Sequence, residues 1–169
     1  MHGTFVYNLL FFLHIACIVV GFGSSFVYPV LAVKARELSP KEAFAINHAA
    51  FSSSKFLTSY PIYAAGFFGL CLIFASEEVW TFKQTWISLA LLMFIIAVAI
   101  ATFLHMPNLK AMDALGERLA NAEPKAGGPP KELAELQERG QKAAMYGGIL
   151  HLLWLLLMLD MVFKPFLSS

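Results

Sequence analysis

Hydrophobic positions form long uninterrupted runs along this chain, and the charged side chains fall between them. Residues 1–33 contain no Asp, Glu, Lys or Arg. The four segments without charge are Phe5–Val33, Phe56–Ser76, Gln84–Leu109 and Ala143–Leu159. The first three have the roughly 20 residues that a helix needs to cross a bilayer. The fourth reaches that length if Asp160 lies at the interface and the helix continues to Phe163. The pattern predicts four spans, at about residues 5–33, 56–76, 85–107 and 144–163.

The composition agrees with one membrane domain over residues 1–169. Of the 169 residues, 59% are hydrophobic and 14% are charged, whereas soluble domains carry about 25% charged residues. The first run has no basic leader and no small-residue cleavage site, so we expect it to stay in the mature protein. The predicted fold class is all-α, an integral membrane antiparallel four-helix bundle in contact with the lipid bilayer. A net charge of +1 gives no reason to expect a nucleic-acid partner.

Lysine and arginine are shared unequally between the connecting segments. Ten of them lie in the connections that follow the first and third spans, and the opposite face has only Lys83 and Lys164. Because cytoplasmic loops are rich in these residues, we expect both long connections in the cytoplasm and both termini on the other side.

Both long connections carry helix signals. Ser39-Pro40-Lys41-Glu42 predicts a helix start with a capping box, and Pro61 predicts a kink in the helix that continues into the second span. Residues 107–142 predict a cytoplasmic helical hairpin between helices 3 and 4, divided by the breaker Pro124–Pro130. The hairpin is either a solvated connector or a docking surface for a partner subunit.

One histidine stands in the first span. His14 is the first of a series of small and polar residues at helical spacing, which forms a stripe with Cys17, Gly21, Ser24 and Tyr28. A titratable ring in hydrocarbon is costly and often marks a functional site. Small residues also allow another backbone to approach closely. The stripe therefore predicts either a cofactor site or a seam between helices.

Two further histidines lie at membrane level. His151 follows Gly147 and Gly148 in the fourth span, and His105 lies near the cytoplasmic end of the third. At 1.5 Å per residue, His14 and His151 differ in depth by roughly 7 Å, so they could share one iron. Imidazole is a common metal ligand and holds haem iron, so His14, His151 and His105 are the candidate metal ligands. Copper, held by His14 with Cys17 or a methionine, is the weaker alternative.

The remaining chemistry is limited. Cys17 and Cys71 both fall within spans, and no C-x-x-C-H sequence for covalent haem attachment is present. Asp160 and Lys164 are spaced to form an ion pair at the outer end of the fourth helix, most simply as an interfacial anchor.

Several short motifs resemble known membrane proteins. Leu13-His14-Ile15 with Phe26-Val27-Tyr28-Pro29, Tyr60-Pro61 with Gly69-Leu70, and the ending Lys164-Pro165-Phe166 resemble HemJ-type protoporphyrinogen oxidases and CopD-like proteins. The chain resembles their small uncharacterised bacterial relatives more closely. The resemblance implies a bacterial inner-membrane location and a haem b ligand at His14. Helix 4, however, has Gly148-Ile149-Leu150-His151 where the HemJ type has an Asn-Glu-x-Pro element.

We therefore expect a b-type haem protein serving electron transfer or porphyrin redox chemistry, with quinone or porphyrin as its redox partner. His14 is the expected axial ligand, His151 is the best second ligand, and Gly21, Ser24 and Tyr28 line the site. If the protein is an enzyme, it is a membrane oxidoreductase of the protoporphyrinogen-oxidase type. The alternatives are a non-catalytic accessory or scaffold subunit of a membrane complex, a homo-oligomer included, and copper handling.

Overall fold

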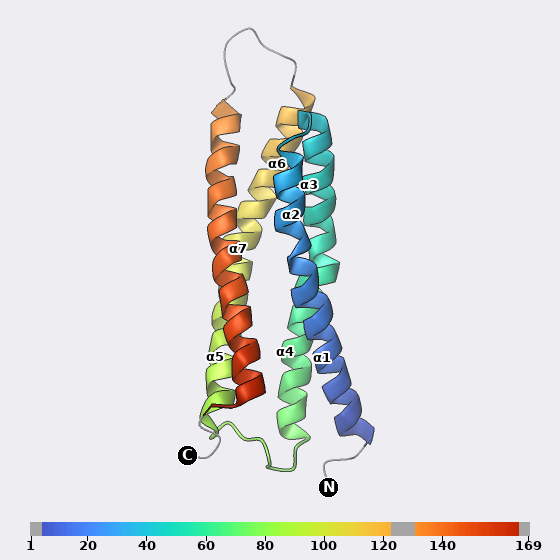
Figure 1. The fold of residues 1–169 in the computed structure, drawn as a ribbon, viewed down its shortest axis with the longest axis vertical. Coiled ribbons are helices and arrows are strands. Elements are labelled where there is room, and N and C mark those ends of the chain that lie inside the picture. The colour runs from blue at the N-terminus through green and yellow to red at the C-terminus, as the bar shows by residue number, and fades with distance from the viewer. Residues whose placement is uncertain (1–4, 123–130, 166–169) are drawn as a thin grey trace.

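A computed structural model describes residues 5–122 and 131–165. All regular structure in those residues is helical, and it forms four long helical columns that run antiparallel to one another (Figure 1). The elements are α1 (Phe5–Ser25), α2 (Val27–Ala35), α3 (Pro40–Ser54), η1 (Lys55–Ser59), α4 (Tyr60–Phe74), α5 (Thr85–Ile100), η2 (Ala101–His105), α6 (Met106–Asn121) and α7 (Lys131–Phe163). The all-α bundle expected from the sequence is confirmed.

Each column is long enough and apolar enough to cross a membrane. The columns cover Phe5–Ala35, Pro40–Phe74, Thr85–Asn121 and Lys131–Phe163 and contain 31 to 37 residues. At 1.5 Å per residue they are about 47–56 Å long, whereas the hydrocarbon core is about 30 Å thick. Every column therefore continues well beyond the bilayer at one end.

Prolines mark the points where the columns change geometry. Pro29 lies just after the break at Phe26 between α1 and α2, and Pro61 and Pro107 each follow a π-helical turn, η1 and η2. A proline lacks the N–H that would bond the carbonyl four residues earlier, so the helix has to adjust there. The predicted kink near Pro61 takes the form of η1.

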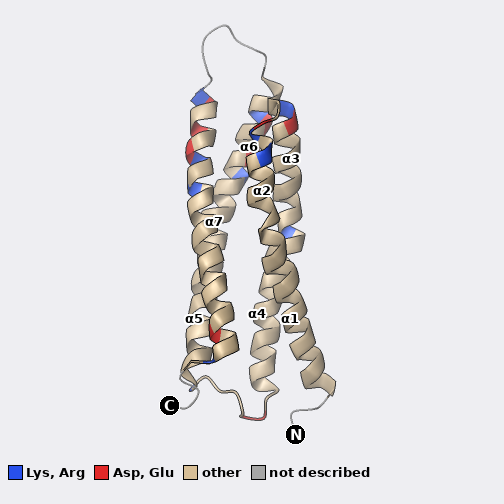
Figure 2. Cartoon of the chain, viewed as in Figure 1, with Lys and Arg blue, Asp and Glu red and all other residues tan. Residues whose placement is uncertain are grey.

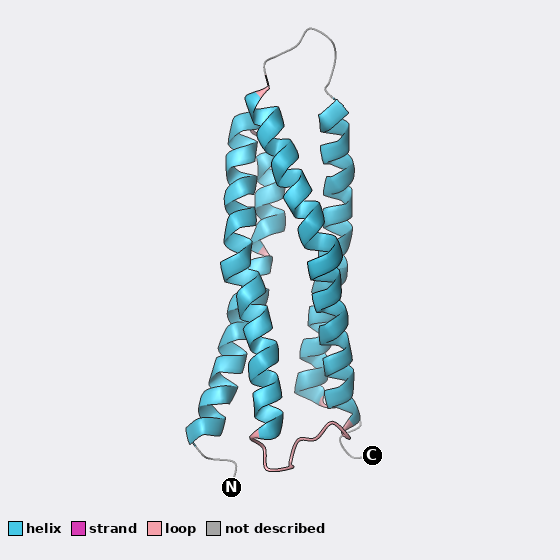
Figure 3. Cartoon of the chain, turned by 180° about the vertical axis from the view of Figure 1, so that it is seen from behind, coloured by secondary structure: helices cyan, strands magenta, loops and turns pink. Residues whose placement is uncertain are grey.

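The columns associate mainly in two pairs within the membrane half. α1 packs on α4, and α5 packs on α7, while α3 packs on α6 and α6 on α7 at the other end. Seen from behind, the loop between α4 and α5 crosses beneath the membrane half (Figure 3). Many large apolar side chains on the outer surface are exposed, among them Phe12, Val19, Phe67 and Phe103. Such a surface suits lipid, which covers it at no hydrophobic cost.

Charged residues gather at the end formed by α3, α6 and the first half of α7 (Figure 2). The start of α1 and the end of α7 lie together at the opposite end (Figure 1). α6 and the first half of α7 form the two arms of the predicted hairpin, and the breaker Pro124–Pro130 lies outside the described residues. The capping box is confirmed, because Glu42 Oε2 accepts the Ser39 backbone N–H at 3.0 Å.

The expected ion pair between Asp160 and Lys164 is wrong. α7 ends at Phe163, and Lys164 has a left-handed backbone with φ 44°, so its side chain leaves the helical spacing. Its ammonium lies 4.3 Å from the ring centroid of Trp80 and 5.5 Å from that of Trp86. Both carboxylate oxygens of Asp160 are buried without a hydrogen-bond partner.

Candidate functional site

His14 lies in the contact between α1 and α4. Its Nδ1 donates a hydrogen bond to the backbone carbonyl of Ala65, with 2.8 Å between the two atoms. The ring also covers Gly69, where an added Cβ would lie 3.1 Å from His14 Cε1. Because a carbonyl only accepts, the proton of the neutral ring is on Nδ1 and the lone pair is on Nε2. Nε2 makes no hydrogen bond within the described residues, so the ring is held in place with its second nitrogen available.

The rest of the predicted stripe faces the same neighbour. A Cβ at Gly21 would lie 2.9 Å from Ile62 Cγ1 and 3.2 Å from the Ile62 backbone nitrogen. Ser24 Oγ lies 2.8 Å from the carbonyl oxygen of Leu57. Thr58 Oγ1 lies 2.7 Å from Ser24 Oγ and donates to the Tyr28 hydroxyl at 3.3 Å. Gly21, Ser24 and Tyr28 thus hold α1 and α2 against α4 and η1, as a seam between helices.

Pro61 gives the Ser24 contact a chemical reason. In a regular helix the Leu57 carbonyl accepts from the N–H four residues later, but that residue is proline and has none. The Ser24 hydroxyl approaches this carbonyl from α1. A polar group on one helix therefore matches a proline on the next.

His151 lies on the face of α7 that is turned toward α1, but at a different depth from His14. Its Nδ1 donates to the Gly147 carbonyl at 2.8 Å, and its Nε2 lies 3.0 Å from Ser25 Oγ. Phe26 covers the ring, with 4.8 Å between the ring centroids. Ser25 is eleven residues beyond His14 in the same helix, which places His151 about 16 Å from His14 along the α1 axis. This offset is larger than the roughly 7 Å that the sequence suggested.

His105 lies near His151 rather than near His14. It is the last residue of η2, and a Cβ at Gly147 would lie 4.0 Å from His105 Cε1. His105 Nδ1 is buried without a hydrogen-bond partner. π-helical turns are frequent at functional sites, and η2 presents this histidine to α7.

These positions decide how far a haem fits. His14 meets the requirements of one axial ligand, because a backbone carbonyl on Nδ1 is the usual support for a metal-binding imidazole. His14 and His151 do not face each other across one iron, because they lie on different levels. Gly66, which could have lined a slot, is covered by the ring of Phe94, which an added Cβ would overlap. His14 therefore has the geometry of one axial ligand, and the described residues place no second histidine at its level.

Copper has less support from the geometry. Cys17 and Cys71 are both free and half-buried. Within the described residues, no three His, Cys, Asp or Glu side chains come together in a group that could hold a metal ion.

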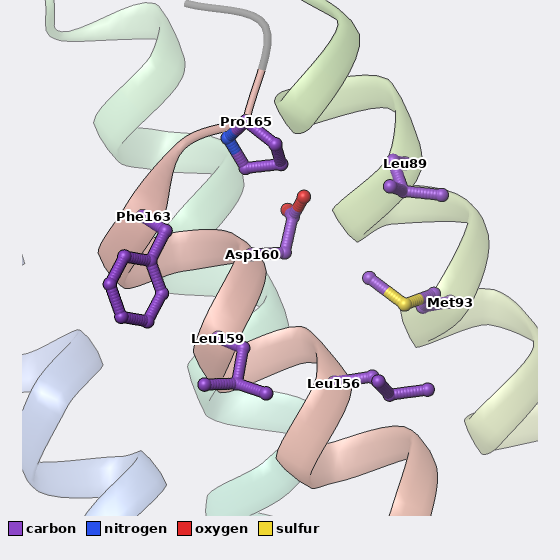
Figure 4. Close-up of a pocket in the computed structure, with 7 residues that line it drawn as sticks. All are labelled: Leu89, Met93, Leu156, Leu159, Asp160, Phe163 and Pro165. Atoms are coloured by element: carbon purple, nitrogen blue, oxygen red, sulfur yellow. The ribbon is translucent and has the colours of Figure 1, made fainter.

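The sequence does not predict one feature, a pocket at the C-terminal end of α7. Asp160 is 5% exposed and lines a pocket of about 370 Å³ between α5 and α7 (Figure 4). The other lining residues are apolar: Leu89, Met93, Leu156, Leu159, Phe163 and Pro165. The signal was present as a single carboxylate within an otherwise apolar run, but we interpreted it as half of an exposed ion pair.

Comparison with known proteins gives a family and nothing finer. No curated protein and no solved structure matches the chain. One family model, described as "Predicted integral membrane protein (DUF2269)", matches residues 8–165. That stretch contains all of the histidines and helices discussed above except the first residues of α1. The chain belongs to this family of integral membrane proteins.

Proposed function

We propose that this protein binds a b-type haem in the membrane through His14 and serves electron transfer or porphyrin redox chemistry. One observation carries the proposal. The imidazole of His14 is fixed by its Nδ1 bond to Ala65 and keeps Nε2 available within an apolar helix pair. A packing role alone uses only one of the two ring nitrogens. A titratable ring at that depth is expensive to keep without a ligand.

The surrounding residues would prepare the ring for a metal. The Ala65 carbonyl fixes the tautomer and makes Nε2 more basic, as such partners do in metal sites. Gly69 lets the ring approach α4 closely, and the apolar surroundings exclude water. When bound, haem b supplies one-electron redox chemistry at its iron. The redox partner would be a membrane-soluble quinone or a porphyrin.

The charge distribution supports a location and an orientation. Lys and Arg lie mostly on the arms formed by α2, α3, α6 and the first half of α7 (Figure 2). Under the positive-inside rule, these arms face the cytoplasm of a bacterial inner membrane and both termini face the other side. The hairpin of α6 and α7 would then be open to a cytoplasmic partner.

The test is an absorption spectrum of the full chain purified from haem-replete cells. We expect a Soret band and, after reduction with dithionite, sharpened α and β bands, with iron and not copper in elemental analysis. His14→Ala should remove or shift these bands. His48→Ala is the matched control, because His48 pairs with Asp113 on the arms at 2.9 Å and is far from the membrane half. A colourless wild-type protein would refute the haem proposal.

The other two membrane histidines define the ligand number. His151→Ala and His105→Ala should both keep the Soret band, because neither ring lies at the level of His14. Loss of the band in His151→Ala would instead indicate that the helices shift to bring both rings to one iron.

A second candidate is a non-catalytic accessory or scaffold subunit of a membrane complex. The observation in its favour is the seam itself, since Gly21, Ser24 and Tyr28 all have packing contacts that need no cofactor. In that case the protein is colourless, and His14→Ala changes only the stability of the α1–α4 pair.

A further inference from the structure

A buried carboxylic acid without a hydrogen-bond donor lies at the outer end of the α5–α7 pair. Asp160 is 5% exposed, and both of its carboxylate oxygens lack a hydrogen-bond partner. Figure 4 shows its carboxyl group pointing from α7 into the space toward α5, with Leu89 and Met93 across from it. A buried polar group without a partner is costly, and such groups are rare in native structures. The arrangement points to a ligand that supplies the missing donor.

The pocket limits the size and polarity of that ligand. Its volume of about 370 Å³ lies near the lower end of the range for small-molecule sites. Apart from Asp160 its lining is aliphatic, with one aromatic ring and one proline. A single ring would fill it, and an attached chain would continue into the lipid that surrounds the bundle.

One cation of the chain already lies at this end of the bundle. The Lys164 ammonium lies over the rings of Trp80 and Trp86 at the same end of the bundle. A neutral hydroxyl can donate to the Asp160 carboxylate without adding a second cation at this end of the bundle.

We propose that this pocket binds the head group of a membrane-soluble hydroquinone, whose hydroxyl donates a hydrogen bond to Asp160. The assignment deepens the proposed function, and rests on it for its purpose, because a hydroquinone is a suitable electron donor for a membrane haem. The binding step itself needs no haem. The site also lies at the end of the bundle opposite the basic arms, where a head group from the lipid can enter between α5 and α7.

The experiment measures binding of decylubiquinol to the purified full chain at pH 8 by quenching of tryptophan fluorescence. Decylubiquinone, which has no hydroxyl donors on its quinone carbonyls, is measured beside it. We expect the hydroquinone to bind more tightly than the quinone. Asp160→Leu should weaken hydroquinone binding about tenfold or more, since a hydrogen bond to a charged group contributes about 1.5–3 kcal/mol. Asp160→Asn should remove the preference for the hydroquinone.

Two further variants keep the test decisive. Asp113→Asn, in the charged arms, is the matched control and should bind like the wild type. Leu89→Phe narrows the pocket without touching the carboxylate and should also weaken binding, which covers the case in which Asp160→Leu fails to fold. Equal affinity in the wild type, Asp160→Leu and Leu89→Phe would overturn the proposal, and so would an absence of quenching in the wild type.

The outcomes separate this site from its rivals. If the Asp160 variants change the oligomeric state in size-exclusion chromatography but not hydroquinone binding, the carboxylate binds another protein helix and the proposal is wrong. A colourless protein that still binds decylubiquinol would refute the haem while leaving this site intact. His14→Ala should lose the Soret band and keep hydroquinone binding.

Discussion

Replacing Gly21 by alanine tests whether the stripe on α1 is a close-packed seam. The added Cβ would lie 2.9 Å from Ile62 Cγ1, 3.2 Å from the Ile62 nitrogen and 3.3 Å from Pro61 Cβ. Two of these neighbours are difficult to displace, because one is backbone and the other belongs to a proline ring. α1 and α4 would have to separate by some tenths of an ångström, and overpacking of this kind typically costs about 1–3 kcal/mol.

Gly23 provides the matched control within the same helix. A Cβ there meets nothing within 4 Å. Both substitutions carry the same change in helix propensity, which favours alanine over glycine by about 1 kcal/mol in water. The difference between the two variants therefore isolates the packing cost. We expect Gly21→Ala to be less stable than Gly23→Ala by about 1–3 kcal/mol.

The assay is reversible unfolding of the full chain in mixed detergent micelles, followed by circular dichroism as the denaturing detergent is increased. The same variants also test the position of His14, the candidate iron ligand. Gly21 lies two turns from His14 on the α1–α4 contact, so a separation there should also weaken the bond between His14 and Ala65. Equal stability of Gly21→Ala and Gly23→Ala would refute the seam.

Two other predictions concern the contacts that fix the columns. Ser24→Ala should destabilise the bundle by about 0.5–2 kcal/mol, because the Leu57 carbonyl loses an interhelical donor; Ser52→Ala, which loses only bonds within its own helix, is the control in the same unfolding assay. Lys164→Met should cost about 0.5–2 kcal/mol and change the tryptophan emission, because it removes the ammonium from the face of Trp80, whereas Lys83→Met in the nearby loop should do neither.

The sequence was sufficient for the columns because lipid imposes a simple rule. A charged residue in hydrocarbon is costly, so the gaps between Lys, Arg, Asp and Glu mark the spans directly. The helix start at Ser39 was equally local, since its capping box needs only Glu42 three residues later. Such features depend on neighbours in sequence and can be found without knowing the fold.

At the C-terminal end of α7, spacing along the sequence predicts the wrong contact. The spacing of Asp160 and Lys164 predicts an ion pair only if the helix continues through both residues. α7 ends between them, and the two tryptophans attract Lys164 away from the acid. Those rings come from the loop before α5 and from α5 itself, and the sequence around Asp160 does not indicate that they lie nearby. Instead of forming the ion pair that the spacing predicts, Lys164 stacks on the tryptophan rings and Asp160 is buried without a hydrogen-bond partner.

The depth of His151 depends on the register of α7 against α1, and this register cannot be read from residue spacing within either helix. The estimate of roughly 7 Å assumed that each helix starts at the membrane surface and rises straight through it. The observed register is set by side chains: the Ser25 hydroxyl meets His151 Nε2, and the rings of Phe22 and Phe26 lie against the imidazole. Because η2 also turns His105 toward Gly147, the three membrane histidines divide into a single ring and a pair. The single ring, His14, has a supported tautomer and an available nitrogen. In the pair, His151 Nε2 lies 3.0 Å from the Ser25 hydroxyl, which also lies 2.6 Å from the Phe22 carbonyl oxygen. The two groups are thus suited to different tasks: substitution of His14 should remove or shift the Soret band, whereas substitution of His105 or His151 should keep it.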